Sequence, residues 1–151
     1  MSEEALQEAL KELERKIDGG EVQEIDRVIS KITLFGSASS IKPLLCLLRD
    51  DALYDEGMYS LIHAAESFDD RTYTCELLDA LPTMCHTSPA WASIVIMRVL
   101  NSDSARGQLT LQARNANQDA KKSLAWLLEQ INNESPAFLS KTVAPLIAAK
   151  G

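Results

Sequence analysis

The stretch SPAWASIVIMRVLN, residues 88–101, decides the fold class, because here a strand competes with a helix. The β-branched residues within 93–100 favour a strand. Two features favour a helix instead: Ser88 is a residue type that accepts the first free amides of a helix, and Pro89 loses no hydrogen bond at the first helical position. No partner strand is apparent elsewhere in the sequence. We therefore predict a helix from about Pro89 to Asn101.

The sequence on both sides of this stretch has the apolar spacing of amphipathic helices. Leu6, Leu10, Leu13 and Ile17 predict a helix over residues 3–17, with Gly19-Gly20 as its stop. The same spacing and the same stop residues predict three further helices in the first half of the chain: Val22–Ile32 ended by Gly36, Ile41–Leu48 with Pro43 near its first turn, and Tyr54–Ala65. A fifth predicted helix is capped by Asp69 or Asp70 and ended at Leu81 by Pro82. After residue 101 we predict a helix capped by Asp103 that runs through Leu109 and Leu111, then Leu124–Ile131, and finally Phe138–Ile147 with Val143 and a break at Pro145.

These predictions give an all-α chain of about nine or ten short helices. Short linkers between helices of three to four turns favour antiparallel pairs stacked side by side, a HEAT-like α-solenoid, with a closed helical bundle as the alternative. A chain of 151 residues is long enough to bury its own core. We expect one all-helical domain over residues 1–151.

Negative charge is concentrated in the first half of the chain. Residues 1–80 carry 18 acidic and eight basic side chains, a net charge of −10, whereas residues 81–151 carry four and seven, a net charge of +3. Between Asp50 and Asp79 only Arg71 opposes nine carboxylates. Such a surface repels nucleic acid and anionic lipid and attracts a basic partner. We therefore expect no nucleic-acid or membrane binding.

The acidic segment has two interpretations. A run of charge is commonly a solvated face that aids solubility. Here, however, Tyr54, Tyr59, Phe68 and Tyr73 are interleaved with the carboxylates. Aromatic anchors beside charges are typical of protein–protein hot spots, although some of these rings must belong to the core.

The cysteines and the N-terminus indicate a cytoplasmic protein. Cys46, Cys75 and Cys85 are odd in number, lack tight spacing and lie in apolar stretches, which favours reduced core thiols. The first residues, MSEEALQEALKELERK, are acidic where a signal peptide needs a basic region and an apolar core. No run approaches the ~20 apolar residues of a membrane span.

No pattern in the sequence predicts catalysis or a cofactor. His63 and Glu66, three residues apart on one helix face, are too few to hold a metal, and we expect them to serve structure. Cys75, Cys85 and His86 include no CxxC pair, and adjacent side chains at 85 and 86 diverge on a helix. We predict no enzyme activity, no metal and no cofactor.

Trp91 and Arg98 lie seven residues apart and therefore face the same way on their helix. Arg98 either pairs with Glu66 to lock adjacent helix pairs or serves as a binding residue on a concave face. Trp126 is expected to fill the core or a space between helices.

Two stretches together resemble the immunity protein 30 family of bacterial polymorphic-toxin and contact-dependent growth inhibition systems. They are GMYSLIHAAESFDDRTYTCELLDALP at 57–82 and SPAWASIVIMRVLNS at 88–102. The resemblance rests on SLIH with Glu66 downstream, on the acidic aromatic turn, and on Pro89, Trp91, Arg98, Leu100, Asn101 and Ser102 in order.

The resemblance implies a cytosolic, non-enzymatic protein that binds the C-terminal domain of a secreted toxin and blocks its active site. Such toxins are often nucleases, whose clefts must be basic, and an acidic protein can occupy such a cleft as a mimic of nucleic acid. An RNase is the favoured toxin, bound by a monomer in a 1:1 complex. The alternative is a HEAT-like scaffold or adaptor for an endogenous partner, which would use a long concave face.

We accordingly predict a toxin-binding surface within the segment from Asp50 to Asp79, and we expect charge reversal there to slow association. Its members are Asp50, Asp51, Tyr54, Asp55, Glu56, Tyr59, Asp69 and Asp70, and His63, Glu66, Trp91 and Arg98 are assigned structural or interface roles.

Overall fold

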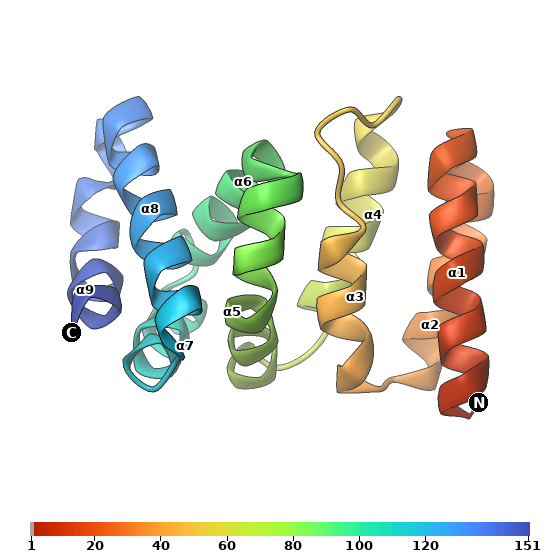
Figure 1. The fold of residues 1–151 in the computed structure, drawn as a ribbon, viewed down its shortest axis with the longest axis horizontal. Helices are drawn as coiled ribbons and strands as arrows, with labels where there is room; N and C mark the ends of the chain where they lie inside the picture. Colours follow the sequence, from red (N-terminus) through yellow and green to blue (C-terminus); the bar gives the residue numbers. More distant parts are fainter. Residues whose placement is uncertain (1) are drawn as a thin grey trace.

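The computed structural model describes residues 2–151, and within that range every regular element is a helix, with no strand. Residues 88–101 form a helix and its flanks, as predicted, so the β-branched residues do not produce a strand. Nine α-helices and two short 3-10 helices make up the described part of the chain (Figure 1). They are α1 (Glu3–Gly19), α2 (Val22–Phe35), η1 (Ala38–Ser40), α3 (Ile41–Cys46), α4 (Asp55–Glu66), α5 (Asp70–Thr87), α6 (Pro89–Leu100), α7 (Asp103–Arg114), α8 (Gln118–Glu134), η2 (Pro136–Phe138) and α9 (Leu139–Lys150).

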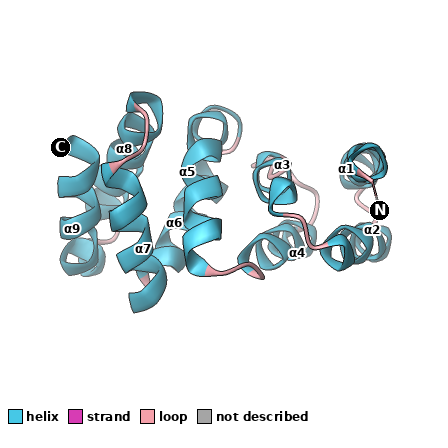
Figure 2. Cartoon of the chain, turned by 90° about the horizontal axis from the view of Figure 1, so that it is seen from below, coloured by secondary structure: helices cyan, strands magenta, loops and turns pink. Residues whose placement is uncertain are grey.

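Helix pairs follow one another along the long axis of the molecule. In Figure 2, α1, α3 and α5 lie in one layer and α2, α4 and α6 in the other. Within the first layer α3 packs on α5, and α2 packs on α4 in the second, while α1 contacts α2 across the layers. One cluster of buried apolar residues runs from Leu6 to Ala149, and the two ends of the chain lie at opposite ends of the long axis (Figure 1). No helix in residues 2–151 is long and apolar enough to cross a lipid bilayer.

The ends of α1 show how the sequence sets helix boundaries. Ser2 Oγ accepts a hydrogen bond from the Ala5 amide at 3.1 Å and caps the helix. At the other end Gly20 adopts a left-handed conformation with φ of 68°, and its amide bonds to the Ile17 carbonyl at 3.0 Å. The predicted Gly19-Gly20 stop is confirmed, with Gly19 forming the last helical residue.

Gly20→Ala is expected to lower the free energy of unfolding by about 1–2 kcal/mol, because an L-residue is strained at this φ. The added Cβ would also lie 2.8 Å from Leu53 Cδ2, so Leu53 must move. Gly107→Ala is the matched control, since Gly107 lies inside α7 and nothing stands within 4 Å of its Cβ position. Urea denaturation should show Gly107→Ala to be stabilising by about 0.5–1 kcal/mol. Equal effects of the two substitutions would contradict the conformation of Gly20.

Several predicted helix boundaries are wrong. Pro82 does not end α5, which continues to Thr87, and Pro145 does not break α9. An internal proline costs roughly 3 kcal/mol, but the residues beyond each one are buried, Met84 in α5 and Ala148 in α9, and this packing holds the helix together. The cap of α7 is Ser102, not Asp103, because Ser102 Oγ accepts the Ala105 amide at 3.3 Å.

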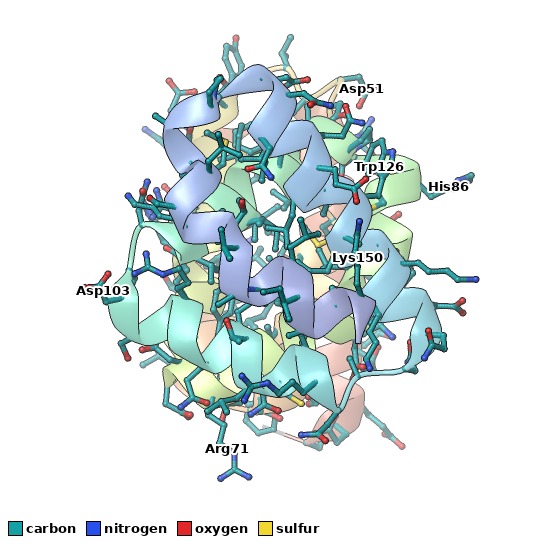
Figure 3. The ribbon with its side chains drawn as sticks, turned by 90° about the vertical axis from the view of Figure 1, so that its left-hand side faces the viewer. Asp51, Arg71, His86, Asp103, Trp126 and Lys150 are labelled. Atoms are coloured by element: carbon teal, nitrogen blue, oxygen red, sulfur yellow. The ribbon has the colours of Figure 1, made fainter. Side chains whose placement is uncertain are left out.

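Three predictions of burial also require correction. Trp126 is 46% exposed and does not fill the core; Figure 3 shows its side chain on the outer side of α8. Cys75 is exposed, so it is not a core thiol. The predicted apolar stripe of α9 is largely uncovered, with Leu139, Val143 and Ile147 all exposed. α7 and α8 pack on α9, and no helix within residues 2–151 covers these three side chains.

Candidate partner-binding surface

The loop between α3 and α4, with the first turns of α4, presents apolar side chains among carboxylates. Leu53 is 71% exposed and Tyr54 53% exposed, and both lie immediately before the helix. Asp51, Asp55 and Glu56 flank them and are also exposed. Figure 1 shows this loop at the upper edge of the molecule. We call the exposed residues Asp51, Leu53, Tyr54, Asp55, Glu56 and Tyr59 the 51–59 surface.

The carboxylates of the 51–59 surface differ in how far they are neutralised. Asp51 Oδ1 accepts a hydrogen bond from Arg49 Nε at 3.2 Å, and Arg49 also pairs with Asp18 from the end of α1. The hydrogen bond with Asp51 raises the pKa of the Arg49 guanidinium. Asp55 and Glu56 have no ion-pair partner among residues 2–151, and both lie in the first turn of α4, where the helix dipole stabilises negative charge. These two are the unneutralised charges of the surface.

Asp50 is exposed and also holds the start of another helix. The amides of Ala90 and Trp91 donate hydrogen bonds to Asp50 Oδ2 and Oδ1 at 3.1 and 3.2 Å. Ser88, which the sequence suggested as the cap of α6, makes no capping hydrogen bond with its side chain. A carboxylate from the α3–α4 loop therefore caps α6 from 40 residues away, and both of its oxygens are occupied.

Asp50→Ala is therefore expected to destabilise the protein by about 1 kcal/mol, because the first amides of α6 lose their acceptor. Asp51→Ala is the neighbouring control and should change stability by less than about 0.5 kcal/mol, since its ion pair is exposed. Chemical denaturation of the two variants measures both changes in stability. Equal stabilities for the two would show that Asp50 does not cap α6.

Asp69 and Asp70 do not join the 51–59 surface. They stand at the start of α5, beyond the far end of α4, and a 12-residue helix is about 18 Å long. Asp69 caps α5, as predicted, through a 3.0 Å hydrogen bond from the Thr72 amide to Oδ2, and that bond lowers the pKa of Asp69. Figure 3 shows the separation, with Asp51 at the top edge of the molecule and Arg71 at the bottom. The acidic segment thus forms two groups at opposite edges.

Two contacts join α4 to α6, and on each helix the two contacting residues lie seven positions apart. The rings of Tyr59 and Trp91 meet edge to face with centroids 5.1 Å apart. Two turns further along both helices, Glu66 accepts two hydrogen bonds from Arg98, at 2.8 Å from Nη2 and 2.9 Å from Nε. Of the two roles considered for Arg98, the structure shows pairing with Glu66 between adjacent helix pairs. Tyr59 remains 36% exposed, so it belongs both to this junction and to the 51–59 surface.

The remaining candidate residues do not assemble into a chemical site. His63 is exposed near the Tyr59 ring, and within residues 2–151 no three His, Cys, Asp or Glu side chains are grouped as metal ligands. Burial raises the pKa of the Cys85 thiol to about 11, which leaves it protonated and poorly nucleophilic at neutral pH. The three cysteines are free.

Sequence reasoning missed Leu53 as a member of the surface. The sequence does hold a signal for its exposure. Leu53 stands beside Tyr54 and between carboxylates, and it does not belong to the apolar spacing of any helix. Leu34, at 89% exposure on α2, is a second exposed leucine, but no cluster of carboxylates and aromatic rings surrounds it in the sequence.

Comparison with known proteins gives one match. The sequence model of the family described as immunity protein 30 matches residues 4–109, which is more than half of the chain. The match includes α1 to α6 and most of α7, and so contains the 51–59 surface and the α4–α6 junction. No curated protein and no solved structure matches the chain.

Proposed function

The chain belongs to the immunity protein 30 family, and from this premise we propose that it neutralises its cognate toxin by covering a basic active-site cleft with the 51–59 surface. Membership makes the chain an immunity protein with a toxin as its partner. The proposal adds the surface, the class of toxin and the mode of action. Neutralisation proceeds by binding, without a catalytic step, in a 1:1 complex in the cytoplasm.

The observation that carries the proposal is the combination of exposed rings and leucine with unneutralised carboxylates at one edge of the molecule. Leu53, Tyr54 and Tyr59 supply apolar contact area, and Asp55 and Glu56 supply charge that nothing in residues 2–151 pairs. Interfaces are stabilised chiefly by a few aromatic anchors, whereas rim charges set the association rate and the orientation. The 51–59 surface holds both kinds of residue.

A nuclease, and in particular an RNase, is the toxin class that this chemistry fits best. An enzyme that binds a polyphosphate backbone needs a basic cleft, and the carboxylates around Tyr54 would occupy the positions of phosphates there. The chain as a whole carries a net charge of −7, which also favours encounter with a basic domain.

Co-expression with the C-terminal domain of the toxin encoded beside this gene tests the proposal. Growth should be rescued, the two proteins should co-purify in equal amounts, and the complex should lack the ribonuclease activity of the free toxin domain. Rescue with full activity retained in the complex would overturn the covering mechanism. A toxin domain that cleaves no nucleic acid would overturn the assignment of the toxin class.

A further inference from the structure

A hollow of about 180 Å³ lies where α4, α5, α6 and α7 meet, at the edge opposite the 51–59 surface. Glu66 from the end of α4, Asp70 from the start of α5 and Arg98 from α6 line it, and we call it the α4–α7 hollow. Val99 and Ala105 supply an apolar part of its wall. Its size suits one long side chain rather than a metabolite with several rings.

Tyr73 lines the same hollow and has an unsatisfied polar group. The residue is buried, and its hydroxyl is the one fully buried side-chain polar atom in residues 2–151 that has no hydrogen-bond partner. Burial raises the pKa of this phenol, so it keeps its proton at neutral pH and can both donate and accept. A buried polar atom without a partner costs free energy, so a donor or acceptor that reached this hydroxyl on binding would stabilise the complex.

The charge of the α4–α7 hollow decides which group would enter. Both oxygens of Glu66 are held by Arg98, so this pair is internally neutralised. Asp70 Oδ2 accepts the Ser104 hydroxyl at 2.5 Å, whereas Oδ1 has no hydrogen bond. With two carboxylates and one guanidinium, the formal charge of the lining is −1.

The starts of α5 and α7 lie beside the hollow and would by themselves favour an anion. Each of these helices carries an aspartate in its first turn, Asp70 and Asp103, which offsets its dipole. Each cap also occupies one free amide of its helix, since Asp69 accepts the Thr72 amide and Ser102 accepts the Ala105 amide. The negative charge of the lining therefore favours a cationic ligand.

We infer that the α4–α7 hollow receives a lysine or arginine side chain of the toxin, with its cation beside Asp70 and Tyr73 and its aliphatic stem along Val99 and Ala105. This inference rests on the proposed function, because the partner is the toxin. It gives the protein a second contact point on the toxin, separate from the 51–59 surface.

Tyr73→Phe and Asp70→Asn test this inference by equilibrium binding to the toxin domain. Tyr73→Phe removes only the unpartnered hydroxyl, so its melting temperature should equal or exceed that of the wild type, while toxin affinity falls about fivefold. Asp70→Asn keeps an oxygen for Ser104 and removes the charge, and should weaken binding about tenfold. Glu14→Gln, an exposed carboxylate on α1 without a side-chain partner, is the control and should bind within twofold of the wild type.

The toxin side of the contact identifies the cation. The lysines and arginines of the toxin domain are replaced one at a time with alanine. One of these toxin variants should bind the wild-type immunity protein more weakly, yet bind Asp70→Asn with the same affinity as the unchanged toxin domain does. Unchanged affinity in both Tyr73→Phe and Asp70→Asn, with the wild type binding normally, would overturn the inference alone. Tighter binding by Asp70→Asn would assign the hollow to an anion. Failure of the wild type to bind would overturn the proposed function and this inference together.

Discussion

Replacing Asp51, Asp55 and Glu56 together with lysine is expected to slow association with the toxin domain about 100-fold at low salt. The change converts the 51–59 surface from three negative charges to three positive ones, so a basic cleft that attracted it now repels it. Stopped-flow association rates at several salt concentrations measure the effect. The wild-type rate should fall as salt rises, because screening weakens attraction, whereas the rate of the triple variant should rise.

A triple variant with the same change in net charge elsewhere separates local from overall charge. Glu14, Asp26 and Glu134 are exposed and have no side-chain partner, so their joint replacement with lysine leaves the 51–59 surface intact. This control should associate within about threefold of the wild type at physiological salt. If both triple variants were slowed equally, net charge rather than the 51–59 surface would steer the encounter.

Tyr54→Ala is expected to weaken toxin affinity about 30-fold, mainly through faster dissociation. Tyr54 is half-exposed and stands in the sequence between the carboxylates of the 51–59 surface, and aromatic anchors are among the residues whose truncation costs most in interfaces. Surface plasmon resonance gives both rate constants. The melting temperature should be measured alongside, because Tyr54 also lines a small pocket together with Gly20 and Val22.

Leu34→Ala is the matched control for Tyr54→Ala. Leu34 is more exposed than Tyr54 but stands on α2, away from the carboxylates of the 51–59 surface, and its truncation should leave both rate constants unchanged. A Tyr54→Ala variant that dissociated as slowly as the wild type would show that the ring is not an anchor, whatever the effect of the charges.

The helices were predictable because their apolar spacing and their glycine stops are local properties. Gly20 and Gly36 end α1 and α2 as expected, and the buried stripe Leu6, Leu10, Leu13 of α1 was visible in the sequence. Pro82 was wrongly predicted to end its helix, because the packing that stabilises α5 beyond Pro82 comes from other helices. Likewise, the spacing of α9 does not show which of its apolar residues α7 and α8 cover.

The candidate site was only partly predictable, because a run of charge along the sequence need not form one surface in space. α4 separates Asp55 from Asp69 by its own length, and the fold turns Asp50 toward α6. The Glu66–Arg98 pair was anticipated as one of two possibilities, since both residues lie on helices at suitable positions. The partnerless hydroxyl of Tyr73 depends on the meeting of four helices and has no signature in the sequence.

Amide hydrogen exchange of the free protein and of its complex with the toxin domain tests the central claim most directly. Tyr54 provides no side-chain cap for α4, so the first amides of this helix should exchange rapidly in the free protein. We predict that toxin binding slows exchange over residues 51–59 more than anywhere else in the chain. Exchange that stays rapid there in the saturated complex, with protection confined to other segments such as α9, would contradict the claim that the 51–59 surface binds the toxin.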